Sequence, residues 1–234
     1  MNDVLFLPTT TSTNDAIRTL EPDEPFFAVA AFEQTGGRGS KGREFFSPYG
    51  GLYLSVSAEI DNGLLPVLTP LAAVAVLRAV KKVFSVDLGV KWVNDLVYKD
   101  NGKKVCGILT ESRTEGVCRA VIGIGVNVFR SQVGYGGYED VVGYLVDASV
   151  DEEVLKVFAK EIFGSIRYLL LHPDEGMAEY AEHSVLTGKK VRFKNDRFDG
   201  EYLVRGVDKT GRILLEKDGE IVACNDGEVI AWQR

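Results

Sequence analysis

The sequence predicts an α+β protein, in which a mixed, largely antiparallel central sheet flanked by helices is followed by a small C-terminal β-barrel. Strand-like segments in the first half follow one another across short turns, and such turns join antiparallel strands. Two long apolar stretches, near 70–85 and 152–171, have the composition of helices that pack on a sheet. Five short strands with tight turns close the chain. We therefore expect a larger domain over 1–184 and a smaller one over 185–234.

Composition limits the classes of protein that the chain can be. Its 234 residues suffice for a medium domain plus a small one, and 45% apolar with 26% charged residues is ordinary for a globular protein. No apolar run reaches the roughly 18 to 20 residues that span a bilayer, and Asn2 and Asp3 do not suit a secretory signal. We expect a soluble, cytoplasmic protein without a membrane partner.

Charge and cysteine content limit the partners further. The net charge of −7 argues against nonspecific binding of nucleic acid, which needs a cationic surface. The three cysteines are widely spaced in apolar, strand-like segments, as expected of buried free thiols in a reducing compartment. The two histidines, His172 and His183, have no partner at metal-ligand spacing, so no structural metal site is expected.

The first half of the chain alternates strands with short helical or glycine-rich segments. Residues 3–8 and 26–32 read as strands, and Ser12 and Thr13 precede a short helix over 14–20. Residues 33–43 form a polar, glycine-rich stretch. Residues 52–60 alternate strictly between apolar and mostly polar side chains, which predicts a half-buried strand.

The second half continues the sheet and then changes texture. A helix is expected over 70–85, strands over 89–99, 104–112 and 117–128, and helices from about 151 to 171 and from 174 to 182. Beyond these, Asp-Gly and Thr-Gly turns separate five predicted strands. They lie at 190–194, 201–207, 212–217, 220–224 and 228–232.

The glycine-rich stretch is the first candidate site. Residues 34–43 place Arg38, Lys41 and Arg43 among four glycines, so that backbone N–H groups can approach an oxyanion and guanidinium groups can clamp it. A mobile, wet surface loop has the same composition. The spacing also fits the dinucleotide fingerprint, but a strand follows where that motif needs a helix. A P-loop fails because Arg43 and Glu44 stand where Lys and Ser or Thr are required.

A second candidate site follows the predicted strand near residue 90. Lys91 could neutralise phosphate, and Asn94 with Asp95 could hold an amide or a metal-bridged phosphate, although an Asn-Asp turn at a strand end is also common. Glycines in the interior of the next strands, such as Gly107 and Gly123, weaken a strand unless a ligand or backbone comes close. Several of them on one sheet favour a ligand.

These segments together resemble the biotin protein ligases. The Ser-Thr-Asn, Gln-Thr-x-Gly-Arg-Gly, Gly-Arg-x-aromatic-x-Ser-Pro, Gly-Leu-Tyr-x-Ser, Lys-Trp-x-Asn-Asp, Lys-x-x-Gly-Ile-Leu and Gly-Ile-Gly-x-Asn-Val patterns of that family occur here in order. They begin at Ser12, Gln34, Gly42, Gly51, Lys91, Lys104 and Gly123. The resemblance implies a class II synthetase-like sheet with an SH3-like C-terminal barrel, and a chain that forms biotinyl-5'-AMP from biotin and ATP with Mg²⁺.

The resemblance also implies a role for each matched residue. The catalytic residues would be Arg38, Lys91 and Lys104. The biotin-binding residues would be Ser12, Thr13, Asn14, Gln34, Gly37, Arg38, Gly39, Ser40, Lys104, Gly107, Gly123 and Gly125. The ATP-binding residues would be Arg43, Phe45, Lys91, Asn94, Asp95 and Asn127, with no residue dedicated to a metal. For Phe45, simple packing is an equally good interpretation as stacking on adenine.

The implied chemistry needs cations and positioning more than a protein nucleophile. The biotin carboxylate attacks the α-phosphate of ATP, and a lysine of a biotin carboxyl carrier protein then attacks the acyl-adenylate. We therefore expect Arg38, Lys91 and Lys104 to meet in one pocket. Ser40 stands where many members carry a second arginine, which predicts weaker retention of the adenylate.

Two rival functions and two further expectations complete the sequence-based interpretation. A lipoate or octanoate protein ligase shares the architecture, and a noncatalytic ATP-binding module would use the same loop. Lys104 and the Gly-Arg-Gly sequence favour biotin. About eleven residues precede Ser12, too few for the helix-turn-helix domain of members that repress transcription, so a monofunctional enzyme is expected. Exposed strand edges and family habit favour a homodimer.

Overall fold

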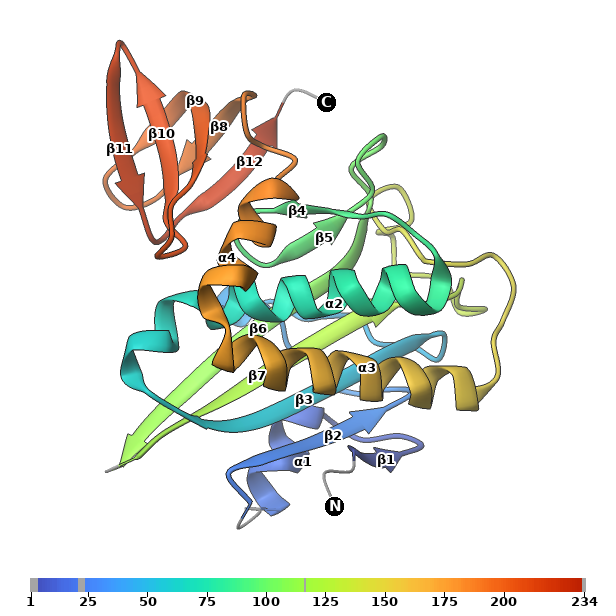
Figure 1. Ribbon diagram of the computed structural model, residues 1–234. Helices are drawn as coiled ribbons and strands as arrows, with labels where there is room; N and C mark the ends of the chain where they lie inside the picture. The colour runs from blue at the N-terminus through green and yellow to red at the C-terminus, as the bar shows by residue number, and fades with distance from the viewer. Residues whose placement is uncertain (1–3, 21–23, 116, 233–234) are drawn as a thin grey trace.

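The main sheet has seven strands and forms the body of the molecule (Figure 1), in a computed structural model that describes residues 4–20, 24–115 and 117–232. The strand order is β1-β2-β3-β7-β6-β5-β4. β1 and β2 run parallel, and every other neighbouring pair is antiparallel. The strands are β1 (Val4–Leu7), β2 (Phe26–Ala31), β3 (Gly51–Ile60), β4 (Gly89–Lys91), β5 (Asp95–Val97), β6 (Lys104–Glu115) and β7 (Val117–Asn127).

Helices cover both faces of this sheet. α2 (Leu68–Phe84) and α3 (Glu152–Leu171) lie side by side across one face, and α4 (Pro173–Glu182) packs on α2 (Figure 1). The short helix α1 (Thr13–Leu20) packs against β2, β3 and β7 on the other face. Two 3₁₀ turns, η1 (Ser40–Gly42) and η2 (Asn62–Val67), complete the set. The predicted mixed, largely antiparallel sheet flanked by helices is confirmed.

The prediction that residues 52–60 form a half-buried strand is wrong in its burial. Leu54 and Val56 join the main core, but Tyr53, Ser55 and Ser57 on the other side of β3 are also buried. The reason is the position of α1, whose first turn lies over this face, with Ser55 Oγ 2.8 Å from Thr13 Oγ1 and 2.6 Å from Asn14 Oδ1. Polar side chains on this strand therefore face another element rather than water.

The predicted strand over 89–99 is two strands. β4 and β5 pair with each other in an antiparallel hairpin, with Lys91 opposite Asp95. The turn consists of Trp92, Val93 and Asn94, and the peptide bond between Trp92 and Val93 is cis. The hairpin brings the lysine and the aspartate of this motif to adjacent positions at one end of the sheet.

One apolar helical segment is longer than the sequence analysis predicts. The helical stretch Asn62–Phe84 is long and apolar enough to cross a membrane by length and composition, which corrects the expectation that no apolar segment reaches that length. Isolated polar residues such as Thr69 and Arg78 hide it from a search for an unbroken run. Two thirds of its apolar window (67%) is buried within the molecule, as in a core helix.

The C-terminal residues form a second, five-stranded antiparallel sheet in the order β11-β10-β9-β8-β12. Its strands are β8 (Lys190–Lys194), β9 (Asp199–Val207), β10 (Ile213–Lys217), β11 (Glu220–Cys224) and β12 (Glu228–Trp232), close to the five predicted segments. The antiparallel C-terminal sheet is confirmed. The SH3-like closure and the boundary after residue 184 stay predictions.

Trp92 connects the two sheets. Its indole Nε1–H donates a hydrogen bond to the carbonyl oxygen of Gly211 at 2.9 Å, and its ring lies 6.1 Å from that of Phe193. Trp92 and Phe193 are both buried in one continuous core. The β4–β5 hairpin at the edge of the main sheet is thus fixed against the C-terminal sheet. The three cysteines are buried free thiols, as the sequence predicts.

Candidate active site

A cavity of about 930 Å³ lies where the central strands, the start of α1, the glycine-rich loop and the C-terminal sheet meet. Every candidate residue from the sequence except Gly37 lines it, and Arg38, Lys91 and Lys104 share its wall as expected. The predicted residues in the wall are Ser12, Thr13, Asn14, Gln34, Arg38, Gly39, Ser40, Arg43, Phe45, Lys91, Asn94, Asp95, Lys104, Gly107, Gly123, Gly125 and Asn127.

The start of α1 is fixed by the glycine-rich segment. Gln34 Oε1 accepts hydrogen bonds from both the backbone N–H and the hydroxyl of Thr13, at 2.8 and 3.0 Å. Its amide nitrogen donates to Ser47 Oγ at 3.0 Å, and Ser47 donates to the carbonyl of Phe45. These bonds fix which end of the Gln34 amide faces α1, because its oxygen already serves two donors.

The side chain of Asn14 spans from β3 to β6 across the face of the sheet. Ser55 of β3 lies 2.6 Å from Asn14 Oδ1 and 2.8 Å from Thr13 Oγ1, while Asn14 Nδ2 donates to Glu111 of β6 at 2.8 Å. Gly123 of β7 stands between these strands, opposite Ser55. A Cβ atom there would lie 2.4 Å from Asn14 Oδ1, so only glycine leaves room for the amide.

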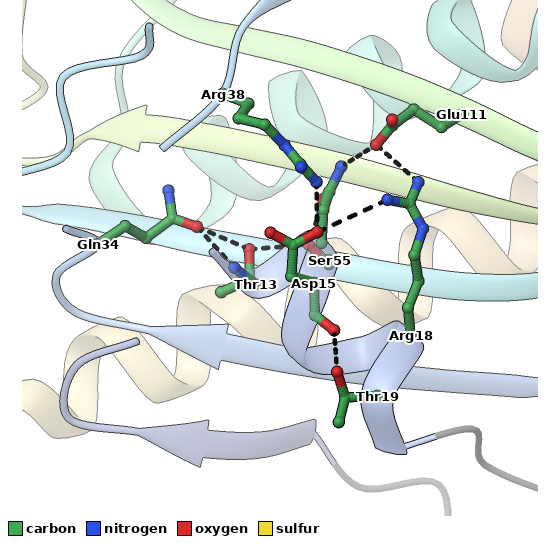
Figure 2. A network of polar contacts seen from close by, with 9 residues as sticks. Thr13, Asp15, Arg18, Thr19, Gln34, Arg38, Ser55 and Glu111 are labelled. Carbon is green, nitrogen blue, oxygen red and sulfur yellow. Dashed lines mark hydrogen bonds and ion pairs between the residues drawn. The ribbon is translucent and has the colours of Figure 1, made fainter. Parts of the chain in front are cut away.

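Arginine and acidic side chains extend this network toward the loop (Figure 2). Arg18 Nη2 lies 2.8 Å from Glu111 Oε2, and Arg38 Nη2 donates to Asp15 Oδ1 at 2.5 Å. The same oxygen of Asp15 lies 3.7 Å from Arg18 Nη1. Arg38 of the glycine-rich loop is thus tied to α1 by a carboxylate of the protein itself.

The strand glycines make room for side chains of the protein. Cβ atoms at Gly107 and Gly125 would lie 2.9 and 2.5 Å from the ring of Phe45. Gly37 lies behind the cavity wall, where a Cβ would meet Ser47 Oγ at 2.2 Å. These glycines were expected to admit a ligand; in this structure the immediate neighbours are Phe45 and Ser47. Phe45 lies beside Lys104, whose Nζ is 5.6 Å from the ring centroid.

The β4–β5 hairpin and β6 bring two lysines to one carboxylate. Lys104 Nζ lies 2.6 Å from Asp95 Oδ1 in an ion pair, and among the described residues no other group donates a hydrogen bond to this buried oxygen. Lys91 Nζ lies 4.8 Å from the centre of the Trp232 ring. Burial lowers the pKa of Lys91; Asp95 opposes that change, and the nearby charge of Lys104 adds to it. A cation whose charge is disfavoured in this way gains from a phosphate beside it.

The two asparagines of the predicted ATP side are partly engaged by backbone. Asn94 Nδ2 donates to the carbonyl of Ile108 at 3.0 Å, and the Ile108 N–H donates to the Asn94 carbonyl at 2.9 Å. Asn127 Nδ2 is 3.4 Å from the carbonyl of Lys104. Both amides therefore fix the ends of strands at the cavity wall.

The C-terminal sheet contributes residues that sequence reasoning missed. Glu228 accepts hydrogen bonds from Lys41 Nζ at 3.3 Å and Arg43 Nη1 at 3.1 Å. Burial tends to raise the pKa of Glu228, but these two cations outweigh it and hold the pKa below its usual value. Tyr135 and Tyr138 also reach the cavity. From the sequence, residues 226–228 indicate a turn only. The contact of Glu228 with the glycine-rich loop follows from the three-dimensional fold.

The fold defines a mixed α+β protein whose cavity gathers cations from the loop, the β4–β5 hairpin and β6, an arrangement suited to small anionic molecules. A model of the biotin/lipoate A/B protein ligase family matches residues 6–127. The bifunctional ligase/repressor BirA of Bacillus spizizenii is 32% identical over 208 residues, and the match covers 80% of this chain and 61% of that protein. The BirA of Escherichia coli is 31% identical over 234 residues, covering 92% and 70%.

Structural comparison agrees with the sequence matches. The biotin protein ligase from Aquifex aeolicus, solved in complex with biotin and ATP, superposes with a TM-score of 0.81 at 24% identity and full coverage of both chains. The chain belongs to the biotin/lipoate A/B protein ligase family. The resemblance to the biotin protein ligases is thereby confirmed. The chain spans about three fifths (61%) of the Bacillus relative that it matches.

Proposed function

We propose that this chain is an ATP-dependent biotin–protein ligase, which forms biotinyl-5'-AMP and transfers biotin to a lysine of a biotin carboxyl carrier protein. The observation that carries the proposal is the meeting of Arg38, Lys91 and Lys104 in one cavity beside a hydrogen-bonding wall at the start of α1. Relatives named as biotin ligases or as ligase/repressors support it. The Aquifex protein of the same fold was solved with biotin and ATP.

The two ends of the cavity suit the two substrates. The ureido ring of biotin has donors and an acceptor, and Ser12, Thr13, Asn14 and Gln34 offer both kinds of group. Arg38 and Lys104 would hold the carboxylate of biotin. On the other side, Arg43, Lys91, Asn94, Asp95 and Asn127 would receive ATP.

The reaction follows from this arrangement by positioning and charge. A carboxylate oxygen of biotin attacks the α-phosphorus of ATP, a C–O–P linkage forms, and pyrophosphate leaves. The amine of the carrier lysine then attacks the acyl carbon, an amide forms, and AMP leaves with the bonding electron pair. Lys91 and Arg43 would offset the negative charge that accumulates on the phosphate. Holding the reactants together supplies much of the acceleration.

Asp95 fits a role toward Mg²⁺. Its buried Oδ1 is paired with Lys104 Nζ at 2.6 Å, and the carboxylate has further lone pairs, so it keeps acceptor capacity beside this cation. Within the part of the chain that the structure describes, no group of three or more His, Cys, Asp or Glu side chains could hold a metal. Mg²⁺ characteristically takes one or two carboxylates and completes its shell with phosphate and water. When bound, it would neutralise phosphate charge.

The decisive experiment offers the purified protein ATP, Mg²⁺, biotin and a biotin-carrier domain, and follows the carrier by intact mass. The expected result is a gain equal to biotin less one water, which is lost when the acceptor lysine is replaced by arginine. An unmodified carrier, with no biotin-dependent exchange of pyrophosphate into ATP, would contradict the proposal and favour a noncatalytic ATP-binding module.

The alternative is a lipoate or octanoate ligase, which the family name includes. Lipoate in the same assay, with its own carrier domain, separates the two. The polar wall around Thr13, Asn14 and Gln34 favours the ureido ring of biotin over an alkyl chain. Asn14 and Gln34 each donate one amide hydrogen within the protein, and an apolar ligand could not accept the second. We further propose a cytoplasmic location and a homodimer; sedimentation of the purified protein tests the dimer.

A further inference from the structure

Glu111 is a carboxylate beside the proposed biotin end of the site, yet it does not line the cavity. It lies on β6 and contacts two residues of α1: it accepts a hydrogen bond from Asn14 Nδ2 and pairs with Arg18. None of the sequence motifs discussed above includes it. Its position behind Asn14 raises the question of what it contributes to ligand recognition.

The side-chain amide of Asn14 has two possible orientations, which differ in the hydrogen bonds that they allow. An amide can rotate by half a turn and exchange its oxygen and nitrogen with little change in shape. On the side of β3, Ser55 lies 2.6 Å from Asn14 Oδ1, and a hydroxyl could serve either end of the amide, as donor or as acceptor. Ser55 therefore does not choose the orientation.

Glu111 does choose it. An ionised carboxylate only accepts hydrogen bonds, so the atom of Asn14 that lies 2.8 Å from Glu111 Oε2 has to be the nitrogen. The reversed amide would place two acceptor oxygens in contact. Arg18, 2.8 Å from the same oxygen, holds the carboxylate in place. Gly123 leaves the space in which the amide spans from β3 to β6.

We propose that Glu111 is a positioning residue for biotin: it fixes the orientation of the Asn14 amide and thereby the donor that Asn14 offers to the ureido ring. The inference rests on the proposed function. One amide hydrogen of Asn14 is donated to Glu111, and the second remains for a ligand. Reversal of the amide would put the oxygen of Asn14 against Glu111, so that two acceptors would face each other.

The test replaces Glu111 by glutamine, which keeps its shape and can accept from or donate to Asn14. The expected result is a KM for biotin raised about tenfold, the effect of about 1.4 kcal/mol on a charge-assisted hydrogen bond, with kcat and the KM for ATP within about twofold of the parent. Glu111→Asp, which keeps an acceptor-only carboxylate, should recover part of the affinity. Calorimetric titration with biotin alone should give the same ranking.

Glu59→Gln is the matched control. Glu59 pairs with Arg119 on the same sheet, its side chain is 35% exposed as is that of Glu111, and it does not line the cavity. Unchanged biotin affinity in Glu111→Gln, an equal loss in Glu59→Gln, or equal losses in the Gln and Asp variants would overturn the proposal. If the parent protein binds no biotin, the proposed function itself is contradicted. If the parent protein binds biotin and Glu111→Gln binds it equally well, only the role of Glu111 is contradicted.

Discussion

Arg38 and Lys104, the two cations proposed to hold the carboxylate of biotin, each contact a carboxylate of the protein. Arg38 meets Asp15 and Lys104 meets Asp95. A substrate carboxylate therefore competes with an internal one for each cation. Because Asp15 and Arg38 are both nearly half exposed, with side-chain exposures of 47% and 44%, water screens their attraction and the competition is mild.

Asp15→Asn is accordingly expected to strengthen biotin binding by about two- to fivefold, the range of an exposed ion pair. Arg38 is released for the substrate, and one negative charge near the carboxylate is removed. The gain should shrink as salt is raised, because added ions screen exposed charges. Calorimetric titration at two salt concentrations measures it. Asp174→Asn on α4 makes the same charge change away from the cavity and should leave affinity unaltered; weaker binding in Asp15→Asn would mean that Asp15 orients Arg38.

Lys91 gives the site a pH dependence of known sign. Burial lowers its pKa in the free protein, so at alkaline pH below its ordinary value of 10.5 part of the population is neutral. A bound phosphate favours the charged form and raises the pKa again. ATP binding should therefore take up protons in that range, and affinity should fall as pH rises through the lowered pKa.

Calorimetry of ATP binding in two buffers of different ionisation enthalpy measures this uptake. Lys91→Met should abolish the uptake and flatten the pH dependence of affinity, while also weakening binding at neutral pH. Proton release by the parent protein, or the same uptake in the variant, would show that another group titrates.

At the scale of elements, a glycine in β7, Gly123, leaves the space that the Asn14 side chain occupies. Gly123→Ala would place a Cβ atom 2.4 Å from Asn14 Oδ1 and force the amide out of its position between β3 and β6. We expect at least about a tenfold loss in biotin affinity and a stability cost of roughly 1–3 kcal/mol from the clash, with ATP affinity retained. Thermal unfolding and titration with each substrate test this. Gly164→Ala, where an added Cβ meets nothing within 4 Å, is the control and should not weaken binding.

The β4–β5 hairpin depends on a tyrosine from α4. The fully buried hydroxyl of Tyr180 donates to the carbonyl of Val93 at 2.9 Å, in the turn between Lys91 and Asp95. Tyr180→Phe leaves that carbonyl without its donor, which should cost about 1–3 kcal/mol and lower Tm by roughly 2–4 °C for each kcal/mol. Scanning calorimetry measures the shift. Tyr168→Phe removes an exposed hydroxyl contact to Glu175 and should change stability by less than about 0.5 kcal/mol.

The elements that could be predicted from the sequence are those with local signals. The C-terminal strands lie between Asp-Gly and Thr-Gly turns, and the structure has them within a few residues of the predicted ranges. The hairpin inside 89–99 was missed because its turn, Trp92-Val93-Asn94, has no glycine and looks like a continuing apolar strand. The burial of both faces of β3 could not be predicted, because α1, which covers the second face, has only eight residues and its sequence does not indicate where it packs.

The candidate site divides in the same way. Motif residues such as Thr13, Gln34 and Lys104 were predicted from pattern and do meet in one cavity. Glu111 and Glu228 were not found, because each works through a partner that is distant in sequence: Glu111 contacts Asn14, and Glu228 contacts Arg43. Such pairs follow from the register of the sheet and from the placement of the C-terminal strands, which no local sequence signal records.

At the scale of the whole molecule, the C-terminal sheet shares the core of the main domain and helps to shape its cavity. Trp92 anchors the β4–β5 hairpin to Gly211, and Lys91 beside it lies against Trp232 of β12. Glu228 reaches back to the glycine-rich loop. The two sheets are therefore expected to unfold together, since neither set of contacts survives the loss of the other sheet.

Trp92→Phe tests this coupling and leaves Trp232 as the only tryptophan of the chain. Loss of the indole N–H leaves the carbonyl of Gly211 without its donor, at a cost of about 1–3 kcal/mol that falls on the contact between the sheets. In urea, the parent protein should give coincident transitions by fluorescence and by far-ultraviolet circular dichroism, which reports the helices of the main domain. In the variant, Trp232 fluorescence should change at lower urea than the dichroism, because the C-terminal sheet separates first. Trp232→Phe keeps the Trp92 contact and should remain a single transition; coincident midpoints in Trp92→Phe would mean that the remaining core contacts hold the sheets together without this hydrogen bond.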